Sequence, residues 1–270
     1  MTGPARTFSS YFDWSRHQWR FVRWTRVAGM PLPAPDAEQL ARLLAAHIVE
    51  HRLRGASAHL IGAWTRVVGG GAPYTAAEKG AISAYLSGLD PGHDPEHLQA
   101  SVGEYLWHAL SIDDAAEPPL VRIEGPKFHA TAPGGDGLVV RRDGQLFFTL
   151  WEIKKHTGNH LTRVIRDGYD QLSSNATRYL AEYSAVGQNI TDPELARMYA
   201  TLVESWLSGS AQAQAGIAVA TSTAPAKCFS TMGRHFAHLS GGDPCRGLLA
   251  AVSGLPSFSH RIAEILWTGL

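Results

Sequence analysis

The sequence contains little cysteine and no long apolar run. Its two cysteines, Cys228 and Cys245, form no cluster of metal ligands, and we expect both to be reduced rather than bridged. No apolar stretch approaches the roughly 20 residues that a membrane-spanning helix needs. The first residues lack an apolar segment followed by a cleavage site, so they do not resemble a secretory signal. We therefore expect a cytoplasmic protein that makes no contact with a membrane.

The sequence also lacks an excess of charge of either sign. Lysine plus arginine number 24 and aspartate plus glutamate number 24, so the formal net charge is +0. A DNA-binding domain that works alone usually carries a basic excess that neutralises phosphates. If this protein binds nucleic acid, its basic surface must be local, or a partner must supply much of the binding.

Motifs that would identify a known binding module are missing, as are internal repeats and low-complexity segments. The glycine run Gly69–Gly71 is not followed by Gly-Lys-Ser/Thr, so it is not a phosphate-binding loop of that type. No zinc finger or RNA-recognition motif is visible. His93, Asp94 and His97 are metal ligands by type, but no fourth ligand has a matching spacing. We interpret them as a loop and a helix cap.

A segment near the N-terminus interleaves aromatic and basic residues. Its sequence, FDWSRHQWRFVRWTRV, permits two interpretations. It is a surface that stacks on bases and binds phosphates, or it is a strand with buried aromatic side chains and solvated arginines. We favour the strand, because aromatic residues are mainly core residues and arginine stems often pack over them. The residues concerned are Trp14, Trp19, Phe21, Trp24, Arg16, Arg20, Arg23 and Arg26.

The chain has 270 residues, enough for one large domain or two small ones at about 100–200 residues per domain. After a proline-rich joint, MPLPAPD, helical patterns follow. Asp36 can cap a first helix, and Thr75 with Glu78 forms a capping box for a later one. We therefore predict a mainly helical N-terminal region with one strand-like segment, residues 1–92, and a second domain, residues 93–270.

The second domain begins with a helix from about Pro95 to Leu110, whose apolar stripe leaves Glu104 on the polar side. A strand-favouring segment follows, LVRIEGPKFHATAP, and then a hairpin and a long helix. Thr191 and Glu194 form a capping box for another helix, which precedes the apolar strand AGIAVATS. A strand, GLLAAVSGL, and an amphipathic helix, SFSHRIAEILW, come last. This order of elements predicts an α/β fold.

The hairpin carries the polar residues of greatest interest. It spans residues 134–155, GGDGLVVRRDGQLFFTLWEIKK, with a turn at Asp143-Gly144. Since side chains two apart share a face of a strand, Glu152 and Lys154 point the same way as Phe148 and Leu150. Both faces of this strand are largely apolar, so we expect it to be central and covered on both sides. Charges at the end of such a strand are costly unless they are paired or bind a metal.

Asp136 at the start of one strand and Glu152-Ile153-Lys154 on the next resemble the signature of the PD-(D/E)XK nuclease superfamily. The resemblance covers roughly residues 95–225. It implies a restriction-endonuclease-like core, αβββαβ, in which helices flank a central mixed sheet. More narrowly, FHATAPGGDGLVV, LWEIKKHTG and a glutamine-bearing helix resemble the nuclease subunit of the Hachiman anti-phage defence system, which works with a helicase partner.

The resemblance implies a deoxyribonuclease that depends on Mg²⁺ or Mn²⁺. Carboxylates on neighbouring strands, about 4.8 Å apart, can share one hard cation. Asp136 and Glu152 would hold the metal, while Lys154 would hold the attacking water or stabilise the developing negative charge. By position in the family, Glu104 is a further catalytic residue and metal ligand. The expected substrate-binding residues are Lys155, His156 and Gln171.

Three alternatives stay open at this point. Glu152 and Lys154 could form an ordinary ion pair between strand ends, without chemistry. The protein could be a non-catalytic nucleic-acid-binding or regulatory subunit that retains a nuclease fold. It could also be a metal-dependent hydrolase that acts on another substrate and leaves DNA intact.

Overall fold

The computed structural model describes residues 7–19, 22–29, 34–55, 57–126, 135–158, 160–223 and 245–270. Within these ranges seven strands form one sheet, in the order β1-β2-β7-β6-β5-β4-β3. The β2–β7, β7–β6 and β6–β5 pairs are parallel and the other pairs are antiparallel, so the sheet is mixed. The strands are β1 (Phe12–Trp19), β2 (Val22–Gly29), β3 (Leu120–Glu124), β4 (Gly137–Asp143), β5 (Gln145–His156), β6 (Ala213–Thr221) and β7 (Cys245–Ala251).

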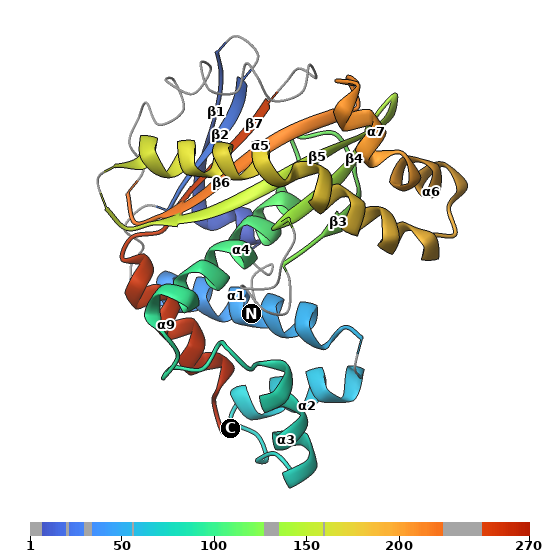
Figure 1. Ribbon diagram of the computed structural model, residues 1–270. Coiled ribbons are helices and arrows are strands. Elements are labelled where there is room, and N and C mark those ends of the chain that lie inside the picture. The colour runs from blue at the N-terminus through green and yellow to red at the C-terminus, as the bar shows by residue number, and fades with distance from the viewer. Residues whose placement is uncertain are drawn as a thin grey trace.

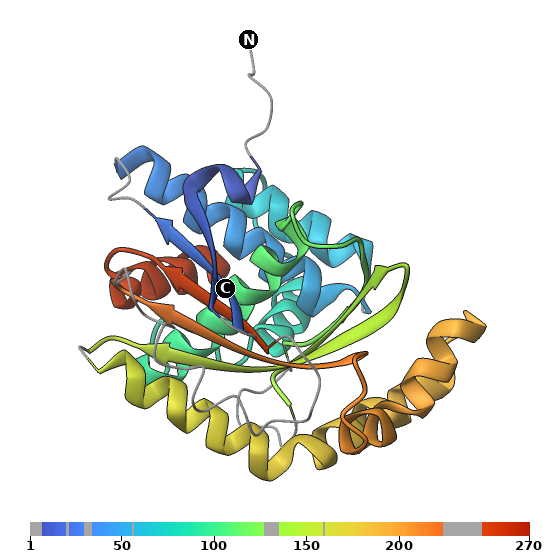
Figure 2. The same cartoon turned by 90° about the horizontal axis from the view of Figure 1, so that it is seen from above.

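Helices cover both faces of the sheet, as Figures 1 and 2 show. On one face α4 packs on the strands, with α1 and α9 beside it and α2 and α3 farther out. On the other face lies α5, followed by α6 and α7. The bounds are α1 (Ala34–Leu53), α2 (Ala58–Val68), α3 (Ala76–Tyr85), α4 (Pro95–Asp113), α5 (Leu161–Val186), α6 (Pro193–Ala200), α7 (Leu202–Leu207) and α9 (Leu255–Leu266), with short 3-10 turns at Phe8–Tyr11 and Gly187–Asn189. The expected α/β class, with helices flanking a mixed sheet, is confirmed.

The alternation of side chains along β5 divides the core into two layers. Trp151 and Ile153 pack in the layer with α4. Phe148 and Leu150 pack in the layer with α5. Because apolar residues occupy both sets of alternate positions, the strand is buried on both sides, as its sequence predicts. The predicted hairpin is also present, with Asp143 paired to Gln145 and Gly144 at φ 69° in the turn.

The N-terminal aromatic and basic segment forms two strands where one was predicted. β1 and β2 pair with each other, and β2 then joins β7 in parallel. The strand interpretation holds for Trp24, which is 7% exposed and stacks on His17, and for the exposed Arg23. Arg20, Phe21 and the side chain of Trp19 lie outside the described residues.

The predicted regions 1–92 and 93–270 share one sheet and one apolar layer. The strands of the first region extend the sheet of the second. Leu44 and Ile48 of α1 belong to the same core cluster as Trp107 of α4. The structure therefore joins the two regions into one body of packed residues.

Helix starts agree with the sequence in part. The Thr75–Glu78 capping box is present. The predicted box at Thr191 is not, because Asp192 takes the capping position and its Oδ1 accepts from the backbone N–H of Glu194 and Leu195. The apolar segment after Ser57 forms α2, and β3 ends at Glu124 while the rest of its predicted strand lies mostly outside the described residues. None of the described helices is long and apolar enough to cross a bilayer.

Candidate functional site

Asp136 and Glu152 lie opposite each other at the start of the hairpin. Gly137 pairs with Trp151, so one further step in the antiparallel register sets Asp136 against Glu152. Residues opposed in this way have Cβ atoms about 4.5–5.5 Å apart. The backbone N–H of Ile153 donates to Asp136 Oδ2 at 2.7 Å, which holds the carboxylate against β5. The register thus brings the two acids predicted from the sequence to one point.

Glu152 is almost fully buried, with 1% of its side chain exposed. Its Oε1 accepts from Lys154 Nζ at 2.8 Å. Its Oε2 has no hydrogen-bond partner among the described residues. Burial and then the charge of Asp136 raise the pKa of Glu152 to about 8, and the Lys154 ammonium opposes that rise. The site therefore holds a carboxyl group that is unfavourable to ionise without a further cation.

Lys154 is held from both sides. Its Nζ donates to Glu152 Oε1 and, at 2.6 Å, to Oε1 of Gln171 on α5. The Gln171 amide in turn donates to the Tyr179 hydroxyl at 3.3 Å. Positions 171 and 179 lie two turns apart on one face of the helix, so α5 presents both toward β5. Gln171, which the resemblance places near Glu152 and Lys154, thus contacts Lys154, and its expected role in substrate binding stays a prediction.

The structure adds two tyrosines that the sequence indicated only as apolar positions. Tyr179 bonds to Gln171, and Tyr183 donates from its hydroxyl to the carbonyl of Gly135 at 2.9 Å. Burial, with the nearby charge of Asp136, raises the pKa of Tyr183 well above its usual value. Tyr183 thereby ties the residue before Asp136 to α5. The spacing of these tyrosines, eight and twelve residues after Gln171, was the available signal.

Glu104 does not join the two acids. It belongs to α4, which packs on the face that carries Trp151 and Ile153, whereas Glu152 points toward α5. In the part of the chain that the structure describes, no three His, Cys, Asp or Glu side chains form a group able to hold a metal. Glu104 was therefore misplaced, because a helical pattern cannot tell which face of a sheet the helix covers.

Lys155 and His156 differ in their relation to the site. Lys155 points to the opposite face, where it forms an ion pair with Glu96 in the first turn of α4, so it is not beside Glu152. The alternation that aligns Glu152 with Lys154 turns Lys155 away from them, and its expected contact with substrate stays a prediction. His156 follows Lys154 by two residues on β5, so the two side chains share a face of the strand. Burial lowers the pKa of His156.

The donor set fits a hard divalent cation. Two carboxylates, one with an unpartnered buried oxygen, suit Mg²⁺, which keeps several waters when proteins bind it. A cation would also oppose the effects of burial and of the Asp136 charge, which together raise the pKa of Glu152.

The chain matches no protein-family model, and no curated protein matches its sequence. The resemblance to PD-(D/E)XK nucleases therefore rests on the residue pattern in the sequence.

Proposed function

We propose that the protein is a nuclease that hydrolyses phosphodiester bonds of DNA with Mg²⁺ or Mn²⁺. One observation carries this proposal. Asp136 faces the buried Glu152 across the hairpin, and a Glu152 oxygen has no partner in the described chain. Such an arrangement is unfavourable by itself and becomes favourable around a cation.

Each residue has a role that its contacts support. Asp136 and Glu152 would hold the cation, which neutralises charge at the phosphate and activates water. The Lys154 ammonium lies beside Glu152, where its positive charge would stabilise the negative charge that develops on the phosphate. Gln171 holds that ammonium in place.

An ordinary ion pair between Glu152 and Lys154 explains less of this geometry than a cation site does. A structural pair needs only Glu152 and Lys154. Asp136 adds a second negative charge that raises the pKa of Glu152, so it works against such a pair. Selection for stability alone would favour an uncharged residue at position 136.

The proposed function includes action together with a helicase. The chain has a net charge of +0, so phosphate binding by this protein alone is limited. The pattern from residue 128 to residue 158 resembles the nuclease subunit of a defence complex in which a helicase engages DNA. The protein would then be the effector subunit of that complex.

The test is cleavage of plasmid DNA with Mg²⁺ or Mn²⁺ against EDTA, with and without any helicase that the neighbouring genes encode. Glu152→Gln and Asp136→Asn should abolish cation-dependent cleavage. Glu96→Gln is the matched control, since Glu96 pairs with Lys155 on the other face and should be dispensable. A parallel RNA substrate establishes which nucleic acid is cut.

Two outcomes would replace this function. If wild type cuts no nucleic acid under any of these conditions yet binds DNA, the protein is a regulatory or binding subunit. If it binds Mg²⁺ through Asp136 and Glu152 but leaves DNA and RNA intact, it is a hydrolase of another substrate.

A further inference from the structure

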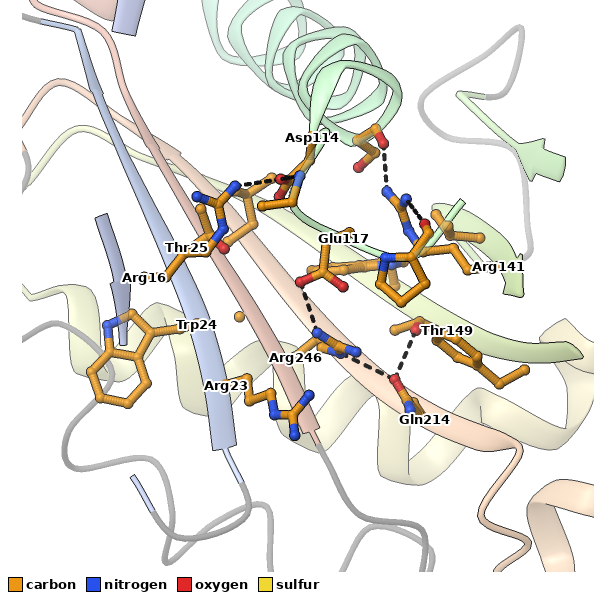
Figure 3. A pocket seen from close by; sticks show the side chains of 18 of the residues that line it. Arg16, Arg23, Trp24, Thr25, Asp114, Glu117, Arg141, Thr149, Gln214 and Arg246 are labelled. Atoms are coloured by element: carbon orange, nitrogen blue, oxygen red, sulfur yellow. Dashed lines mark hydrogen bonds and ion pairs between the residues drawn. The ribbon is translucent and has the colours of Figure 1, made fainter. Parts of the chain in front are cut away.

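A cavity of about 670 Å³ opens on the sheet face opposite to Glu152. Figure 3 shows it beyond the end of α4, bounded by the loop that carries Asp114 and Glu117. The face is apolar beneath α4 and becomes polar where that helix ends. Neighbouring strands contribute the polar side chains Arg16 (β1), Arg23 and Thr25 (β2), Arg246 (β7), Gln214 (β6), Thr149 (β5) and Arg141 (β4).

The floor of the cavity holds an amide with an unused donor. Gln214 is 5% exposed, and its Oε1 accepts from Arg246 Nε at 3.1 Å and from the Thr149 hydroxyl at 3.3 Å. These two bonds orient the amide, and its Nε2 has no acceptor among the described residues. The Nε2 group is not among the buried unpartnered atoms, so it is open to the cavity and can donate to a ligand acceptor there.

The lining of the cavity has one more arginine than carboxylates, since it holds Arg16, Arg23, Arg141 and Arg246 together with Asp114, Glu117 and Asp143. Arg16 pairs with Asp114, and Arg246 pairs with Glu117 at 2.8 Å. Arg23 has neither a hydrogen bond nor an ion pair within the described chain. It lies beside Arg246 in the β2–β7 register, and burial, with a smaller effect from the Arg23 charge, lowers the pKa of Arg246. An anion between the two guanidinium groups would relieve this repulsion.

Arg141 adds a second cation without a carboxylate partner among the described residues. It is 7% exposed and donates to two carbonyls, those of Pro118 at 2.7 Å and Ser111 at 2.6 Å. Its positive charge is therefore held at the cavity wall by neutral groups. Guanidinium groups are the preferred protein partners of phosphate, which they bind through paired N–H donors.

Aromatic side chains complete the lining. The Trp151 ring lies over Gly216, where an added Cβ would come within 2.5 Å of it. Its Nε1 is buried without a hydrogen-bond partner in the described part of the chain. Phe147 lines the cavity beside it. Flat apolar surfaces next to phosphate-binding groups suit a planar ring joined to a phosphate, and the volume lies within the roughly 300–1,000 Å³ usual for small-molecule sites.

We propose that this cavity is a second binding site, separate from the acidic site, and that it takes a nucleotide. Arg23 and Arg246 contact the phosphate, Gln214 donates to it or to the sugar, and the base lies toward Trp151 and Phe147. The nucleotide is either a free monophosphate or the phosphorylated end of a nucleic acid strand. The site stands on its own observations and does not depend on nuclease activity.

The test is calorimetric titration of the full chain in EDTA with AMP, inorganic phosphate and a 5′-phosphorylated trinucleotide. Arg23→Gln and Gln214→Leu should each weaken nucleotide binding about tenfold. Arg163→Gln is the control, because Arg163 has an 80% exposed side chain on α5. Glu152→Gln should also leave nucleotide binding unchanged. Thermal melting of each variant establishes that it folds.

The outcomes separate cleanly. Binding of AMP as tightly as the trinucleotide supports a free nucleotide, and binding of the trinucleotide alone supports a strand end. Absence of binding by both at millimolar concentration overturns the site. Inorganic phosphate that binds as tightly as AMP overturns the assignment of the base. If Glu152→Gln loses nucleotide binding while Arg23→Gln retains it, the nucleotide binds on the face of Glu152 and the proposed site is overturned.

Discussion

The two faces of the central sheet carry opposite charge imbalances, although β5 contributes to both. Toward α5, Asp136 and Glu152 place two carboxyl groups together, and the Lys154 ammonium pairs with Glu152. On the other face, Arg23 and Arg141 leave positive charge without carboxylate partners in the described chain. Alternate side chains of one strand would therefore serve the cation-binding site and the anion-binding site proposed above. The comparison teaches that one strand can border two different electrostatic environments, because its alternate side chains point to opposite faces of the sheet.

The largest difference between the two faces is expected when two adjacent lysines that point to opposite faces are replaced one at a time. Lys154→Met should lower DNA cleavage by about 100-fold or more, as loss of a group that stabilises developing charge does. Lys155→Met removes the same charge one residue later, where it pairs with Glu96, and should retain most activity. Initial rates of plasmid cleavage at fixed Mg²⁺ measure both. Equal losses in the two variants would show that face does not matter.

A steric change at the hairpin tests how closely the two faces are coupled. A Cβ at Gly137 would come within 2.0 Å of the Trp107 ring, which packs from α4. Gly137→Ala should therefore destabilise the protein by about 3 kcal/mol, as other overpacked core positions do. Urea unfolding measures the free energy. Gly80→Ala, in α3 with no atom within 4 Å of the added Cβ, should instead be neutral or slightly stabilising.

The acidic face should lose stability as pH rises. The folded-state pKa of Glu152 is about 8, above the ordinary glutamate value of 4.5, so its stabilising contribution is complete below about pH 4.5 and is lost as pH rises through 8. Between pH 5 and 8, the difference in unfolding free energy between wild type and Glu152→Gln should change by roughly 3 kcal/mol. Mg²⁺ should reduce this loss, and its affinity should increase with pH. A pH-independent difference would contradict the buried-acid assignment.

The helices behind the other face should respond in the opposite direction. His47 and His108 share a 2.8 Å hydrogen bond between α1 and α4, and burial lowers their pKa values to about 4 and about 3. Their contribution to stability is present above about pH 6.5 and is lost as pH falls toward 4. His108→Gln should reduce the pH dependence between 7 and 5 by about 1 kcal/mol. His93→Gln, on an exposed loop, is the control for urea unfolding at each pH.

Local rules account for the parts of the site that the sequence predicted. A two-residue alternation and an Asp-Gly turn suffice to bring Glu152, Lys154 and Asp136 together, because both act within one hairpin. The same alternation, applied one residue further, would have excluded Lys155. Gln171 was predictable from the resemblance, because the family carries a glutamine in the helix that follows the strand of Glu152 and Lys154.

The remainder depends on pairing between distant segments. Nothing within residues 12–29 indicates that β2 pairs with β7, so the arginines of the two strands could not be assigned to one cavity. Glu104 failed for a similar reason, because the choice of face belongs to the packing of α4 against β5 and β6 rather than to the helix itself. The start of α6 shows a smaller limit: Thr191 and Asp192 both make good caps, and their sequence does not rank them.

The pairing of β2 with β7 has a consequence for how the chain is made. A ribosome releases β2 early, yet the strand that covers its edge emerges only after nearly all of the protein has been synthesised. During that interval β1 and β2 expose an unpaired edge rich in tryptophan, a surface prone to intermolecular pairing. Slow translation or low temperature during expression would lengthen the exposure, so a chaperone or an early-bound partner that covers this hairpin should raise the yield of native protein.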